Sequence, residues 1–277
     1  MWSIANTTPY VVGVEILRDR EGAETLVLVV KATFLVSATG ECAVAPNQVD
    51  IVRVPQFSGE PGQSSLVTDT EFVPAKPKTD VLLLGHAFAP RGTRAASVDV
   101  ALQVGELRNE FRVWGDRRWR RGSLRWSVTE PAPFERMPIV YERAYGGTHG
   151  KPDANGVLRC DPRNPVGRGF DAEARADGDL LPNTEHVNAT NRPAGFGPIA
   201  RHWEPRVKLA GTYDDDWKQH RHPLVPTDFD DLFYQTAPLE QQSAAPLTGG
   251  ESVALRNLTP SGLLQFKLPR IPLLARS

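Results

Sequence analysis

The chain has 277 residues, a length that fits one large β domain or two modest domains. Hydrophobic residues make up 40% of it, enough for a real core and too many for a disordered chain. Its 32 basic and 33 acidic residues give a formal net charge of −1. This balance excludes a global attraction to nucleic acid or to an anionic membrane, so a charged partner would need a local patch.

The first residues, Met-Trp-Ser-Ile-Ala-Asn, have neither the basic nor the apolar region of a secretory signal. No apolar run approaches the roughly 18 residues that cross a bilayer. We therefore expect a cytoplasmic protein without a membrane partner.

The first half of the chain is predicted to form strands. Residues 11–16 are a short apolar run. In residues 25–36, leucines such as Leu26 and Leu28 alternate with Val27 and Val29, so both faces are apolar. The pattern predicts that this strand is central and covered on both sides.

The clearest hairpin covers residues 97–114. Val98, Val100, Leu102 and Val104 alternate with smaller or polar residues, which is typical of a strand with one wet face. Gly105 and Glu106 supply a two-residue turn, with glycine where a type II′ turn requires it.

The periodicity disappears between Gly146 and Pro205, a stretch rich in proline, asparagine and aspartate. A connection this long is uncommon in a compact domain, and it is usually functional or disordered. Its isolated aromatic residues Phe170, Phe196 and Trp203 are expected to pin it to the body.

Two short helices are predicted after this tract. One covers residues 213–220 with Thr212 as its cap, and the other covers 228–235 with Thr227 as its cap. Strands return at 252–255 and 263–268. A strand-rich beginning and end suggest that the terminal strands join the same sheets.

These elements predict one fold class for the whole chain. We expect a mainly β protein with antiparallel sheets in a sandwich-like single domain over residues 1–277. A long irregular loop tract and one or two short helices complete it.

The chain carries no recognisable catalytic motif for hydrolases, metalloproteases or nucleotide-binding enzymes. The best metal candidates are Asp214, Asp215 and Asp216 near His220 and His222, since Asp216 and His220 would share one face of a helix. His86 is a candidate buried base. The pattern of Asp214–Asp216 and His220 also has a purely structural explanation, because acidic residues are favourable at the start of a helix and His220 lies in a solvated polar run. We expect no catalytic residue, metal or cofactor, and keep a metal-dependent or carbohydrate-directed enzyme as the alternative.

A basic cluster with interleaved tryptophans runs from Arg117 to Trp126. Single-stranded nucleic acid binders use such residues, and so do protein–protein interfaces. Because strands alternate faces, the arginines would be divided between two sides of a hairpin. Plain solvated surface, a protein partner and a local nucleic-acid site all remain open from this pattern, and we expect no nucleic-acid partner.

Several segments together resemble one bacterial family. They are Gly59–Gly62 with Ser64–Leu66, then Lys76–Ala87, Phe111–Arg117, Met137–Gly147, Asn164–Phe170, Leu181–Asn183, Pro193–Ile199, and Ala210–Asp214 with Trp217. Their order and number resemble a domain family, once of unknown function, whose members are adaptors or chaperones for type VI secretion effectors. The resemblance covers residues from about 9 to 269.

The resemblance implies a cytoplasmic protein of Gram-negative bacteria without catalytic activity. Its partners would be a cognate effector, often one containing a PAAR-type tip domain, and the VgrG spike on which the effector is mounted. The residue types predict partner contacts at Trp119, Arg120, Arg168, Phe170 and Trp203. Phe170 and Trp203 have a second interpretation, as anchors that only pin the loop tract.

Overall fold

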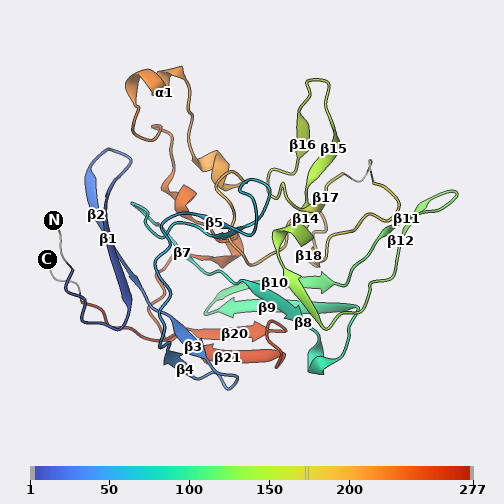
Figure 1. Ribbon diagram of the computed structural model, residues 1–277, viewed down its shortest axis with the longest axis horizontal. Helices are drawn as coiled ribbons and strands as arrows, with labels where there is room; N and C mark the ends of the chain where they lie inside the picture. Colours follow the sequence, from blue (N-terminus) through green and yellow to red (C-terminus); the bar gives the residue numbers. More distant parts are fainter. Residues whose placement is uncertain (1–3, 172, 174, 275–277) are drawn as a thin grey trace.

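The computed structural model describes residues 4–171, 173 and 175–274, and the fold that they form is mainly β, as predicted (Figure 1). In this described part of the chain, one five-stranded antiparallel sheet is accompanied by eight two-stranded ribbons. All but one of the ribbons are antiparallel.

The five-stranded sheet joins distant parts of the chain in the order β18-β10-β9-β20-β21. Its strands are β9 (Ser97–Val104), β10 (Leu107–Trp114), β18 (Thr184–Glu185), β20 (Ser252–Arg256) and β21 (Leu263–Lys267). The predicted hairpin 97–114 is confirmed, and Gly105 has the positive φ, 55°, of a type II′ turn.

One face of this sheet forms the main core. Val100 of β9 and Phe111 of β10 are 1% exposed, and Phe111 packs on Phe196 of the loop tract with ring centroids 4.5 Å apart. The ribbon of β8 (Gly85–Phe88) and β13 (Arg136–Ile139) covers the same core. The opposite face carries polar residues, as predicted, including an exposed ion pair between Asp99 and Arg112, although Ala101 on this face is buried.

The prediction of a central strand over residues 25–36 is wrong. The segment divides into β2 (Glu24–Lys31) and β3 (Phe34–Val36), and β2 pairs with β1 (Val11–Arg18) in a two-stranded hairpin. Leu26 and Leu28 are 49% and 44% exposed. Apolar residues on both faces of a strand do not guarantee that both faces are buried. This hairpin packs on the body with one face only.

The terminal strands join the main sheet only in part. β20 and β21 belong to it, whereas β3 and β4 (Cys42–Val44) form a separate ribbon. The turn of this ribbon lies against β21. A Cβ atom added to Gly40 in this turn would lie only 2.0 Å from the carbonyl oxygen of Gln265.

The remaining ribbons and helices surround the sheet. The ribbons are β5 (Gln56–Phe57) with β6 (Leu66–Thr68), β7 (Thr79–Asp80) with β19 (Gln242–Ser243), β11 (Trp119–Arg121) with β12 (Trp126–Val128), β14 (Tyr145–Gly146) with β17 (Arg168–Gly169), and β15 (Thr148–Pro152) with β16 (Leu158–Cys160). The helices are α1 (Asp215–His220) and the 3-10 helices η1 (Pro90–Gly92), η2 (Tyr141–Arg143), η3 (Arg206–Leu209), η4 (Asp231–Tyr234) and η5 (Leu239–Gln241). In the described residues, no helix combines the length and the apolar character that crossing a membrane requires.

Both predicted helix caps are wrong. Helix α1 is capped by Asp214, whose side chain accepts a hydrogen bond from the Trp217 amide at 2.9 Å, while Thr212 bonds to Asp228. The second predicted helix is only the 3-10 turn η4, which is capped by Asp230. In both cases an aspartate closer to the helix takes the capping position from the predicted threonine.

The loop tract is pinned to the body, as predicted, by Phe196 and Trp203, both 0% exposed. Trp203 lies in a second core cluster with Tyr141 and Leu66, and the Tyr141 and Trp203 rings meet edge to face at 5.5 Å. Because the tract has little regular pairing of its own, these buried rings supply much of its attachment.

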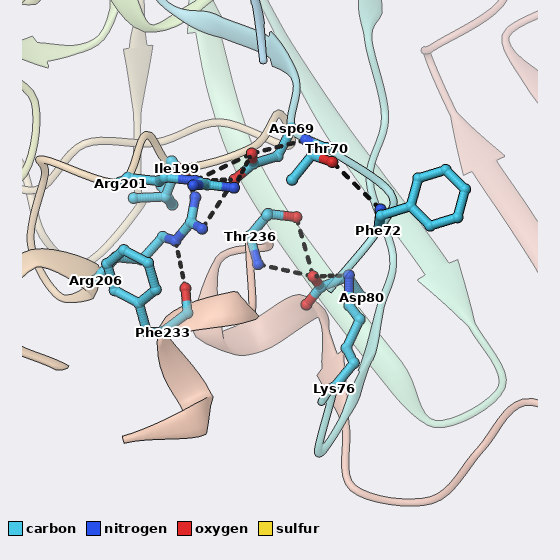
Figure 2. A network of polar contacts seen from close by, with 10 residues as sticks. All are labelled: Asp69, Thr70, Phe72, Lys76, Asp80, Ile199, Arg201, Arg206, Phe233 and Thr236. Atoms are coloured by element: carbon cyan, nitrogen blue, oxygen red, sulfur yellow. Dashed lines mark hydrogen bonds and ion pairs between the residues drawn. The ribbon is translucent and has the colours of Figure 1, made fainter. Parts of the chain in front are cut away.

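An ionic network centred on the buried Asp69 ties this residue to Arg201, near the end of the tract, and to Arg206 (Figure 2). Asp69 accepts hydrogen bonds from Arg201 and from Arg206, whose side chain is 3% exposed. Arg206 also donates to the carbonyl oxygens of Ile199 and Phe233, at 2.7 and 2.9 Å. Burial alone would raise the pKa of Asp69, but the bonds and charges of the two arginines outweigh it and hold this pKa below its ordinary value.

Candidate functional site

A cleft of about 600 Å³ lies between the β11–β12 hairpin and the β14–β17 strand pair. Its wall contains three arginines, Arg143, Arg168 and Arg175, together with Trp119 and Phe170. We call it the arginine cleft. The hairpin beside it projects at one edge of the molecule (Figure 1).

The floor of the cleft is backbone packed around one buried amide. Asn164 is 0% exposed and donates to the carbonyl oxygens of Tyr141 and Tyr145. A Cβ on Gly146 would lie 2.2 Å from the Asn164 carbonyl oxygen, and one on Gly167 would lie 2.3 Å from its side-chain nitrogen. Glycine at both positions lets the two parallel strands close around Asn164.

Two of the arginines converge on a second buried amide, Asn183. Its side-chain oxygen accepts hydrogen bonds from Arg168 at 2.8 Å and from Arg143 at 3.2 Å. Its side-chain nitrogen donates to the Trp114 carbonyl oxygen and to Asp116, each at 3.0 Å. Asn183 therefore holds two guanidinium groups within a few ångströms of each other.

Arg175 is held by aromatic rings. Its guanidinium carbon lies 4.5 Å from the ring centroid of Trp119 and 5.2 Å from that of Trp126. The two tryptophans meet edge to face across the hairpin. Within the described part of the chain, the buried Nε atoms of Arg168 and Arg175 have no hydrogen-bond partner.

The carboxylates of the cleft are occupied by other donors. Glu142 accepts from the Ser65 amide at 2.8 Å, from the Ser65 hydroxyl at 2.6 Å and from Ser58 at 3.0 Å. Asp171 faces His149 at 3.2 Å, and Asp179 accepts from the Ala176 amide at 2.6 Å. The arginines and the carboxylates of the cleft thus have largely separate partners.

Glu142 makes the stability of this region depend on pH. Burial acts to raise the pKa of Glu142, but the hydrogen bonds from Ser65 and Ser58 lower it below 4.5. A lowered pKa in the folded state contributes stability that is complete above the unfolded value and is lost as the pH falls through the folded value. We expect Glu142→Gln to be less stable than the wild type at about pH 6, and this difference to shrink toward about pH 3. Urea unfolding at several pH values checks this, and a difference independent of pH would contradict it.

Three of the five predicted contact residues meet in the cleft: Trp119, Arg168 and Phe170. Arg120 is exposed and pairs with Ser127, on the hairpin face opposite Trp119. Trp203 is fully buried, so it anchors the tract, and a direct partner contact would require the tract to open.

Sequence reasoning missed Arg143 and Arg175. Arg143 lies in the segment Met137–Gly147 that contributed to the resemblance, and its cationic side chain was a signal that could have been used. Arg175 lies in an irregular segment without periodicity, so nothing in the local sequence indicates that it stacks on Trp119 and Trp126.

The predicted metal and base candidates do not converge. His220 faces Asp216 at 3.0 Å, but both side chains are largely exposed, and Asp214 is the helix cap. His86 lies beside Arg136 at 3.2 Å; burial and this arginine lower its pKa. In the part of the chain that the structure covers, no three or more His, Cys, Asp or Glu residues are grouped to hold a metal ion.

The basic cluster is divided, as the alternation of faces predicts. Arg117 pairs with Glu185 at 2.6 Å and lies over the Trp114 ring, while Arg118 donates to the Gly178 carbonyl oxygen at 2.7 Å. These contacts fix individual arginines to the loop tract, so the cluster is not one continuous basic strip.

A second candidate surface is the outer face of the β1–β2 hairpin. Gly13 lies on the inner face, where its missing Cβ position is 2.8 Å from Phe72 and 2.9 Å from Ile51. The opposite face carries three aliphatic cross-strand pairs, Val12 with Val30, Val14 with Leu28, and Ile16 with Leu26, and the charged pair of Arg18 and Glu24 follows them at the end of the hairpin. We call it the hairpin apolar face. Ile16 is 53% exposed on it, more than Leu26 or Leu28.

Comparisons with known proteins give one result. Neither curated proteins nor solved structures show a significant match to the chain. The model of the family DUF2169, described as an uncharacterized protein conserved in bacteria, matches residues 21–277. The chain therefore belongs to the bacterial family DUF2169.

Proposed function

We propose that this protein is an adaptor that binds a cognate type VI secretion effector in the cytoplasm and helps to load it onto the VgrG spike. It would act by binding and not by catalysis. The observation that carries the proposal is the hairpin apolar face, where six aliphatic side chains lie in register and Ile16, Leu26 and Leu28 are about half exposed. An exposed contiguous apolar surface is typical of a protein–protein interaction site.

The arrangement of surfaces also supports an adaptor. The β1–β2 hairpin and the β11–β12 hairpin beside the arginine cleft lie at opposite edges of the molecule (Figure 1). An adaptor must hold two partners at once, and separate surfaces allow this without competition. The resemblance of the sequence to effector adaptors suggests the effector and the spike as these partners.

The proposal is tested by co-expression with the effector encoded beside this protein. We expect the wild type to co-elute with that effector in gel filtration. The double variant Leu26→Glu/Leu28→Glu should bind at least about tenfold more weakly, a loss of about 1.4 kcal/mol, because two charges would enter the apolar contact. Isothermal titration measures this change.

Leu263→Glu is the matched control, because Leu263 is a 51% exposed leucine on strand β21 of the five-stranded sheet. It should bind like the wild type. The free energy of unfolding of every variant should lie within about 0.5 kcal/mol of the wild-type value, as is usual for surface substitutions. Failure of the wild type to co-elute with any adjacent effector would contradict the proposal, and equal binding by the double variant would remove the hairpin apolar face from it.

A further inference from the structure

We infer that the arginine cleft anchors a carboxylate side chain, flanked by an apolar side chain, on an extended segment of the partner protein. The carboxylate chemistry rests on the cleft itself. Only the identification of the carrier as a protein partner rests on the proposed function.

The first support is the positive charge of Arg168. Arg143 and Arg168 both donate to the uncharged oxygen of Asn183, so the two cations meet at an amide and not at a shared carboxylate. Arg143 has Asp116 at 3.2 Å, whereas Arg168 has no carboxylate within 4.0 Å in the described residues. Two guanidinium groups at this separation repel each other. An anion that contacts both of them would add two attractive interactions that outweigh this repulsion.

The electrostatic surroundings of Arg168 point the same way. Burial lowers its pKa, and the neighbouring charges of Arg143 and Arg118 lower it further, against the opposing effect of Asp116. Its buried Nε also has no hydrogen-bond partner among the described residues. An unpaired buried donor is costly, so the Arg168 guanidinium is incompletely hydrogen-bonded within the described part of the free protein.

The lining favours a carboxylate over a phosphate. Glu142, Asp171 and Asp179 also line the cleft, and they would repel the nearly double charge of a phosphate more than the single charge of a carboxylate. An Arg–carboxylate contact can be bidentate, which a site with two adjacent guanidinium groups readily provides.

The walls explain the apolar neighbour and the extended shape. Trp119, Phe170, Val140 and Leu180 line the cleft beside the arginines. Its volume of about 600 Å³ is in the range of small-ligand sites, enough for a few residues of an extended chain. A short acidic segment with one aromatic residue fits both the charge and the walls.

The test titrates the full-length protein with the peptide acetyl-Gly-Phe-Glu-Gly-amide and follows the tryptophan indole signals by NMR. The Trp119 signal, assigned with Trp119→Phe, should shift and saturate. The matched peptide with glutamine in place of glutamate should bind at least about tenfold more weakly, since it lacks the charge that Arg168 and Arg143 meet. Inorganic phosphate, as a second probe, should bind more weakly than the glutamate peptide.

Arg168→Gln should abolish the preference for glutamate, and Arg168→Lys should restore only part of it, because lysine cannot form the bidentate contact. Arg120→Gln, on the far face of the same hairpin, should leave this preference intact.

Equal binding of both peptides by the wild type, or tighter binding of phosphate, would overturn the inference. Should the peptides fail to bind while the effector still co-elutes with the wild type and with Arg168→Gln, the cleft inference is wrong and the adaptor function stands. Binding of the glutamate peptide without co-elution of an effector supports the cleft and contradicts the adaptor function.

Discussion

Asp69→Ala is expected to lower the free energy of unfolding by about 3–5 kcal/mol, as the removal of one partner of a buried ion pair does. The cause is the charge that remains. Arg206 is almost completely buried, and without Asp69 its guanidinium keeps only the carbonyl oxygens of Ile199 and Phe233. Urea unfolding followed by tryptophan fluorescence measures the loss.

The exposed pair of Asp99 and Arg112 is the matched control. It is also joined by two hydrogen bonds, at 2.6 and 3.0 Å, but both side chains are well exposed. Asp99→Ala should cost less than about 1 kcal/mol, as water replaces the lost partner. The double variant Asp69→Leu/Arg206→Met should recover part of the stability, because no buried charge is then left alone. A cost at Asp69 no greater than that at Asp99 would falsify this account of the network.

Trp203→Ala is expected to lower the free energy of unfolding by about 3–5 kcal/mol, because the removed ring leaves a cavity in the core. The Trp203 ring is 0% exposed, packs against Tyr141 and donates its indole N–H to His202 at 2.9 Å. Its removal would leave a void under the loop tract that the body cannot fill. Thermal and urea unfolding should show the loss, and limited proteolysis should show faster cleavage within the tract.

Two controls separate the cavity from other causes. Trp203→Phe should cost clearly less, because it keeps most of the volume and loses mainly the hydrogen bond to His202. Trp119→Ala should also cost less, because Trp119 is only half-buried on a hairpin. If Trp203→Ala were as mild as Trp119→Ala, the tract would have to be held mainly by other contacts, such as those of Asp69.

Local sequence was sufficient where local rules decide the structure. The hairpin of β9 and β10 follows from strict alternation and from a Gly-Glu turn, both of which lie within eighteen residues. The error at residues 25–36 has the opposite cause. Whether Leu26 is covered depends on which distant segments pack against the hairpin, and the alternation of residues does not carry that information.

The candidate site shows the same division. Residue type was enough to select Trp119, Arg168 and Phe170, since arginine and aromatic residues are typical of binding surfaces. Their meeting in one cleft depends on Asn164 and Asn183, two buried amides in segments without periodicity. Their hydrogen bonds join segments distant in the sequence, and no pattern in the chain predicts such pairings.

The order of strands in the central sheet has a consequence for synthesis of the protein. Strand β9 pairs on one side with β10, which follows it directly, and on the other with β20, where Val104 meets Val253. A nascent chain can form the first pairing early, but the other edge of β9 stays open until the segment containing Val253 has left the ribosome. Such long-range pairing slows folding and exposes an unpaired strand meanwhile. The interval between the emergence of β10 and that of β20 is therefore a period in which this protein is vulnerable to aggregation.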